Sequence, residues 1–113
     1  MTLRLATLAV ALFAAGTTLA APHGNASAGK AKAGPCAACH GDGNKTLAPI
    51  YPKLAGQYPD YLSKALHEYK SGKRSNPIMM AQAANLSDQD IADLTEYFGA
   101  MSGGIHDLSG HSR

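Results

Sequence analysis

The chain contains two cysteines, Cys36 and Cys39, and both lie in one short motif, Cys-Ala-Ala-Cys-His. The thiols are three positions apart, and the imidazole of His40 follows the second one directly. Groups placed so close together can hold one ligand in common or react with each other. Whatever this motif holds therefore constrains the fold of the whole 113-residue chain.

The segment before the motif has the pattern of an export signal. Residues 1–20 carry one basic residue, Arg4, then an apolar run that ends at Ala15, and they close on small residues. This pattern predicts a secretory signal peptide cleaved after Ala20. A membrane anchor is the alternative, but the apolar run is short for a span. We expect a soluble mature protein in the periplasm, with no membrane span of its own.

The mature domain, about 90 residues long, is small. A domain of that size buries a modest core and usually needs a disulfide, a metal or a large prosthetic group. Export permits a disulfide, but a Cys36–Cys39 bridge would close a very short loop and constrain the unfolded chain little. We therefore expect the cysteines to hold the group that completes the core.

Helical patterns dominate the mature chain, and no segment alternates like a strand. Residues 28–38 are rich in Ala and Lys, although Gly29 and Gly34-Pro35 interrupt them. Residues 59–70 carry an apolar stripe, and residues 87–101 begin with the capping box Ser87-x-x-Asp90. The stripe consists of Tyr61, Leu62, Ala65, Leu66 and Tyr69. The sequence predicts an all-α fold with three main helices.

The remaining segments are expected to be irregular. A flexible leader at 21–27 and a polar tail at 103–113 flank a domain at 28–102. Within this domain, residues 41–57 and 71–85 are predicted loops. Long loops are unusual in so small a domain, and the first one has few large apolar residues. A ligand around which the loops wrap would hold them in place.

Four kinds of site are compatible with the cysteine motif. Zinc would need two more ligands, and the other histidines are scattered. A redox dithiol normally follows a strand, and a structural disulfide would explain neither the histidine nor the loops. Cys-x-x-Cys-His is the signature of covalent haem attachment, in which each thiol adds to a porphyrin vinyl group and the imidazole reaches the iron. The export signal, the helices and the small core favour haem.

Three stretches, "CAACHGDGNK", "PKLAGQ" and "LSDQDIADLTEYF", together resemble a class I bacterial cytochrome c. The resemblance runs from about residue 27 to residue 101 and is closest to the domain that occurs twice in diheme periplasmic cytochromes c. This chain has one such motif and departs from the diheme pattern. The resemblance implies a class I cytochrome c fold, with loops wrapped around one covalently bound haem c.

The resemblance also implies roles for individual residues. Cys36 and Cys39 would carry the thioether bonds, and His40 would bind the iron. The carbonyl of Pro52 would accept a hydrogen bond from the imidazole and orient it. Gly29 and Tyr97 lie where the terminal helices of the family cross.

The sixth iron ligand is expected to be a methionine, as is usual in the family. The candidates are Met79, Met80 and Met101. Met79 and Met80 lie in the predicted loop after Pro77, and Met79 has the family spacing of seven residues before Leu86. We expect Met79 to bind the iron, with Met80 as the alternative.

These ligands leave no open position on the iron, so we expect an electron carrier and not an enzyme. The expected partners are redox proteins: a terminal oxidase, a quinol-oxidising complex or a dehydrogenase, with no nucleic acid. The alternative function is a haem c subunit that accepts electrons within a dehydrogenase or flavoenzyme complex. We expect a monomer.

Overall fold

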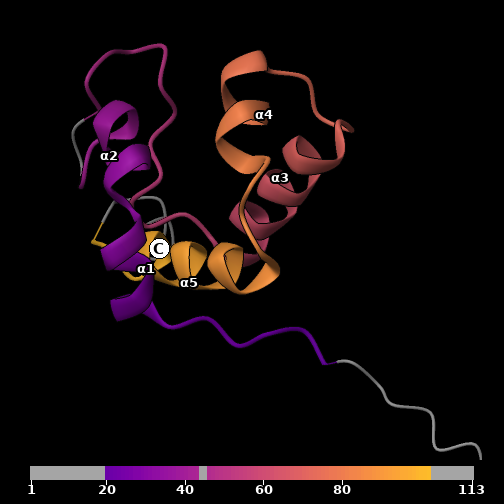
Figure 1. The fold of residues 1–113 in the computed structure, drawn as a ribbon. Helices are drawn as coiled ribbons and strands as arrows, with labels where there is room; N and C mark the ends of the chain where they lie inside the picture. The colour runs from indigo at the N-terminus through magenta and orange to yellow at the C-terminus, as the bar shows by residue number, and fades with distance from the viewer. Residues whose placement is uncertain (1–19, 44–45, 103–113) are drawn as a thin grey trace, which may run out of the picture.

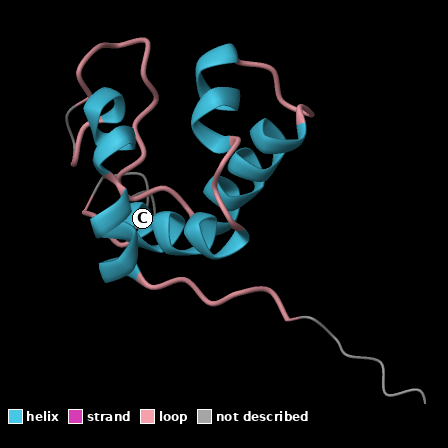
Figure 2. Ribbon diagram, in the orientation of Figure 1, coloured by secondary structure: helices cyan, strands magenta, loops and turns pink. Residues whose placement is uncertain are grey.

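The computed structural model describes residues 20–43 and 46–102. The predicted signal peptide up to residue 19 and the predicted tail from residue 103 lie outside the described residues. The described part contains five helices and no strands, which confirms the all-α prediction (Figures 1 and 2). None of its helices is both long enough and apolar enough to cross a bilayer. The helices are α1 (Ala26–Lys32), α2 (Gly34–His40), α3 (Pro59–Ser71), α4 (Pro77–Ala83) and α5 (Asp88–Gly99).

The first predicted helix, residues 28–38, is in fact two helices. α1 begins two residues earlier than the prediction, because the Asn25 side chain accepts a hydrogen bond from the N–H of Ala28 and caps it. Residues 26 and 27, expected in the leader, are therefore helical. α1 ends at Lys32, and Pro35 lies in the first turn of α2, where its missing N–H costs no hydrogen bond.

The prediction of a loop over residues 71–85 was wrong, because α4 lies within it. The Asn76 side chain accepts a hydrogen bond from the N–H of Met79 at 3.0 Å, and Pro77 occupies the first turn. The residues that follow are mostly good helix formers. Both candidate methionines are therefore held on a helix.

α1 and α5 cross at very close range, as the resemblance implied. A Cβ added at Gly29 would lie 2.0 Å from the backbone oxygen of Asp93 and 2.8 Å from the Cβ of Tyr97. The expected crossing at Gly29 and Tyr97 is thus confirmed. Gly24 makes a second close approach, since its added Cβ would lie 2.2 Å from the backbone oxygen of Ala92. Only glycine fits at either position without moving the helices.

A buried carboxylate ties the N-terminal segment to α5. Asp93, 3% exposed, accepts hydrogen bonds at 2.8 Å from the N–H of Asn25, from Lys32 Nζ and from Gln89 Nε2. Lys32 also pairs with Asp90 at 2.7 Å. Hydrogen bonding with Lys32 holds the pKa of Asp93 below its ordinary value. The crossing therefore has an apolar contact and a satisfied polar network.

The core lies between α1, α3 and α5. Its central cluster consists of Ala33, Leu62, Leu94 and Phe98. Figure 1 shows α2 above one end of α5 and the pair formed by α3 and α4 above the other end. The capping box predicted for α5 is present, with Ser87 and Asp90 bonded reciprocally. This arrangement leaves a space between α2 and the α3–α4 pair.

Candidate cofactor-binding site

A cavity of about 490 Å³ lies between α2 and the α3–α4 pair. Part of α5 and the segment from residue 50 to 57 complete its walls. Leu62, Leu94 and Phe98 belong both to the core cluster and to the cavity wall, so the cavity opens directly onto the core. Most of its lining is apolar, as is usual in ligand-binding cavities.

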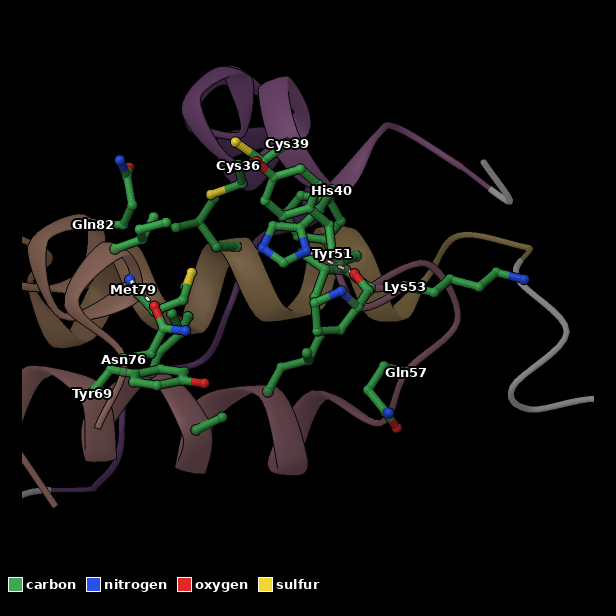
Figure 3. Close-up of a pocket in the computed structure, with 18 of the residues that line it drawn as sticks. Cys36, Cys39, His40, Tyr51, Lys53, Gln57, Tyr69, Asn76, Met79 and Gln82 are labelled. Carbon is green, nitrogen blue, oxygen red and sulfur yellow. Dashed lines mark hydrogen bonds between the residues drawn. The ribbon is translucent and has the colours of Figure 1, made fainter. Parts of the chain in front are cut away.

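The α2 wall presents the two cysteines. Cys36 and Cys39 are free, half-buried thiols that lie one helical turn apart and line the cavity (Figure 3). Burial raises the pKa of the Cys36 thiol, which favours its neutral form. The two thiols can therefore reach neighbouring points on one ligand edge.

His40 ends α2 and is 8% exposed. Its Nδ1 lies 2.7 Å from the carbonyl oxygen of Pro52, which can only accept, so Nδ1 carries the proton and donates. Nε2 is then left with a lone pair for a metal. In Figure 3 the His40 ring and the Met79 side chain point toward one another across the cavity. The Tyr51 ring packs edge-on against it, with 6.1 Å between ring centroids.

The three candidate methionines differ in whether their side chains line the cavity. Met79 lines the cavity, whereas Met80 is 37% exposed and is not part of the lining. Met101 packs against the core cluster instead of the cavity. The cap from Asn76 holds the N–H of Met79 and so fixes the turn that carries its side chain. Cys36, Cys39, His40, Pro52 and Met79 all line the cavity.

Sequence reasoning missed several residues of the site. The sequence marked the apolar stripe of α3 without indicating what covers it, and all five of its members line the cavity. The signal was available, because one small domain offers few protein partners for so broad a stripe. Arg74, Asn76 and Gln82 also line the cavity. No spacing in the sequence marks these polar residues.

The family model for cytochrome c matches residues 26–102. The chain belongs to the cytochrome c family. It is 50% identical over 93 residues to cytochrome c4 of Pseudomonas aeruginosa, which covers 80% of this chain and 46% of that protein. It is 44% identical over 81 residues to cytochrome c-554(548) of Halomonas halodenitrificans, covering 69% of this chain and 98% of that one.

A solved structure shows the same cytochrome c fold. Reduced recombinant cytochrome c4 from Pseudomonas stutzeri superposes with a TM-score of 0.66 and 42% sequence identity, over 71% of this chain and 47% of that one. The predicted class I cytochrome c fold is thereby confirmed. The chain spans about half the length of the cytochrome c4 relatives.

The cavity fits the cofactor of the cytochrome c family, covalently bound haem c, which was also predicted from the sequence. An apolar slot suits the porphyrin faces, and two thiols on one wall suit attachment at two vinyl groups. A buried imidazole with Nε2 unprotonated and a thioether across the cavity are donors that haem iron accepts. When bound, haem c supplies an iron that gains or loses one electron.

Proposed function

We propose that this chain is a one-electron carrier that works through a covalently attached, six-coordinate haem c. One observation carries the proposal: His40 and Met79 face each other across a cavity that both cysteines of the attachment motif also line (Figure 3). In this assignment Cys36 and Cys39 form the thioether bonds. His40 Nε2 and the sulfur of Met79 would hold the iron.

The surrounding residues fit these roles. The carbonyl of Pro52 accepts the Nδ1–H of His40, which orients the ring and makes Nε2 a stronger donor. A thioether ligand raises the reduction potential and favours the ferrous state. With His40 and Met79 both holding the iron, no open position would remain for a substrate. The chain therefore transfers electrons and has no catalytic centre of its own.

The export signal supports the proposed location. Residues 1–20 direct the chain to the periplasm, where it works as a monomer. Its partners are redox proteins such as a terminal oxidase or a quinol-oxidising complex. The names of the c-type relatives support electron transfer, and covalent attachment suits a carrier that must keep its haem as it diffuses.

A second candidate function is a haem c subunit that accepts electrons in a dehydrogenase complex. One relative, from Chlorobaculum tepidum, is named the cytochrome subunit of sulfide dehydrogenase and is 37% identical over 68 residues, covering 59% of this chain and 60% of that protein. Size-exclusion chromatography of the protein from its native source separates the two candidates. A carrier elutes alone, whereas a subunit elutes with a flavoprotein.

The ligand assignment is tested by replacing each methionine. We expect the oxidised protein to show a far-red sulfur-to-iron charge-transfer band, and Met79→Ala to abolish it. The variant should bind added imidazole and should shift the ratio of reduced to oxidised protein at fixed potential at least tenfold toward oxidised, about 59 mV. Met80→Ala is the matched control and should keep the band.

A band lost in Met80→Ala but retained in Met79→Ala would move the sixth ligand to Met80. If neither variant alters the spectrum, both assignments fail. A wild-type protein from which acidified organic solvent extracts all haem would refute covalent attachment itself.

A further inference from the structure

The segment from residue 46 to residue 52 carries the Pro52 carbonyl without the support of a helix. Its last turn is closed by a backbone hydrogen bond, in which the N–H of Tyr51 donates to the carbonyl of Ala48 at 3.0 Å. A β-turn closed in this way fixes the backbone of its last residue. The turn therefore sets where the Tyr51 side chain and the carbonyl that follows it can lie.

Tyr51 and Pro52 contact the same imidazole by different means. The carbonyl oxygen of Pro52 lies 2.7 Å from Nδ1 of His40. The Tyr51 ring packs edge-on against the imidazole, with 6.1 Å between ring centroids and 62° between ring planes. Figure 3 shows the Tyr51 side chain beside the His40 ring. Two consecutive residues thus supply a polar and an aromatic contact to one side chain.

The hydrogen bond between His40 and Pro52 lies close to the protein surface. His40 is buried, whereas Pro52, which carries the acceptor, is exposed and Tyr51 is half-buried. A water molecule that reached the carbonyl would compete with the imidazole for its lone pairs. Exclusion of water makes such a bond electrostatically stronger, because the local dielectric constant falls. The bond therefore needs a cover, and the Tyr51 ring is placed to provide one.

We propose that the Tyr51 ring is a positioning group for the iron ligand: it keeps the Pro52 carbonyl on His40 Nδ1 and shields their hydrogen bond from water. The inference rests on the proposed function, because it concerns His40 as a ligand of the haem iron. The contact is made from ring to ring, so the aromatic ring performs this role and the phenol hydroxyl is not required.

This shielding has a consequence for the iron ligand. An imidazole that binds a metal through one nitrogen becomes a stronger donor when its other nitrogen is hydrogen-bonded. Water that replaced the Pro52 carbonyl as acceptor in some molecules would give those molecules a different donor strength at His40 Nε2. A shielded bond keeps the donor strength of His40 the same in every molecule, and a carrier with a single reduction potential requires that.

Four variants separate the parts of the tyrosine side chain. Tyr51→Phe removes the hydroxyl and keeps the ring, whereas Tyr51→Ala removes both. Tyr51→Leu keeps apolar bulk without an aromatic ring and serves if the alanine variant fails to fold. Tyr58→Ala is the matched control, because Tyr58 is 59% exposed and lies outside the cavity lining.

Hydrogen exchange tests the proposal. In the reduced, haem-loaded protein, NMR follows the rate at which the Nδ1 proton of His40 exchanges with deuterated water at one pH and temperature. The reference is the backbone N–H of Leu94 in the core, so the ratio of the two rates is insensitive to a general loss of stability. Tyr51→Ala should raise this ratio about tenfold, because exchange reports local opening to solvent. Tyr51→Phe and Tyr58→Ala should stay within about threefold of wild type.

Three outcomes would overturn the proposal while covalent haem is present. One is an unchanged ratio in Tyr51→Ala or its leucine substitute, which would leave the ring as a filler of space. Another is an equal rise in Tyr51→Phe, which would assign the effect to the hydroxyl. The third needs no variant: a wild-type Nδ1 proton that exchanges before the first spectrum is recorded would show an unshielded bond. Wild-type protein without covalent haem would instead refute the proposed function.

Discussion

Two faces of α5 are in different surroundings: one is covered by protein, and the other lines a cavity. On one side α1 packs directly against it, and Gly29 allows the two backbones to approach so closely that a single added methyl group would clash. On the other side Leu94 and Phe98 face a cavity of about 490 Å³. The first interface is protein against protein, and the second is a wall that needs a ligand.

This difference shows that only part of a small domain's stability comes from contacts between protein groups, and the rest depends on the bound group. At the α1–α5 crossing the chain supplies both surfaces, together with the polar network around Asp93. At the cavity the chain supplies one surface of the contact, because lining side chains such as Tyr61, 48% exposed, and Ile78, 59% exposed, have apolar area that a bound group can cover. The crossing should therefore tolerate loss of the haem better than the cavity does.

Removing the haem anchors should have the largest effect. The double variant Cys36→Ser, Cys39→Ser should carry no covalent haem and should be largely unfolded, because the prosthetic group is part of the core. Circular dichroism measures the loss of helix, and the mass of the protein reports the haem. A double variant with wild-type helix content would show that α2, α3 and α4 hold together without the ligand.

Opening the helix crossing should have an intermediate effect. Gly29→Ala places a Cβ 2.0 Å from the backbone oxygen of Asp93, so α1 must move away from α5, at a cost of about 1–3 kcal/mol in the free energy of unfolding. Urea unfolding of the haem-loaded protein measures this value. Gly43→Ala is the control: its Cβ meets nothing within 4 Å, and the change should stay within about 0.5 kcal/mol. Equal stability of the two variants would mean that the crossing is loosely packed.

The smallest effect on stability is expected from replacing Asp93, the carboxylate at the α1–α5 crossing. The pKa of Asp93 is lowered in the folded protein, so its ionised form stabilises the fold above the unfolded pKa of about 3.9, and that contribution is lost as the pH falls. Asp93→Asn should therefore be less stable than wild type at pH 7, and the difference should shrink below about pH 4. The effect is small because Lys32, its cation partner, is 38% exposed and water screens the pair.

The urea concentrations at the midpoint of unfolding, measured at pH 7 and pH 3 for wild type and Asp93→Asn, test this prediction. Gln89→Glu is unsuitable as a control, because it adds charge beside the same carboxylate. Lys64→Met is better, since it removes an exposed ion pair with Glu68 on α3 and should leave the acid dependence unchanged. A difference between Asp93→Asn and wild type that persists at pH 3 would contradict an electrostatic role.

Features that depend on residues close together in the sequence were easier to predict than features that depend on residues far apart. The motif from Cys36 to His40 and the box from Ser87 to Asp90 are local signals, whereas the crossing at Gly29 was expected only from the family resemblance. The helix α4 was missed because its start depends on Asn76 as a cap before Pro77, and that pair also resembles a turn. The role of α3 stayed open because an apolar stripe does not reveal whether protein or a ligand covers it.

The sequence alone determined the chemistry of the cofactor. Two thiols and an imidazole at fixed spacing point to covalent haem, because attachment depends on residue types within one helical turn. Only the tertiary structure decided which distant groups meet that cofactor. Pro52 reaches Nδ1 of His40, and Met79 turns inward while Met80 remains exposed. These placements depend on how α2, α3 and α4 are arranged around α5, and no short segment contains that information.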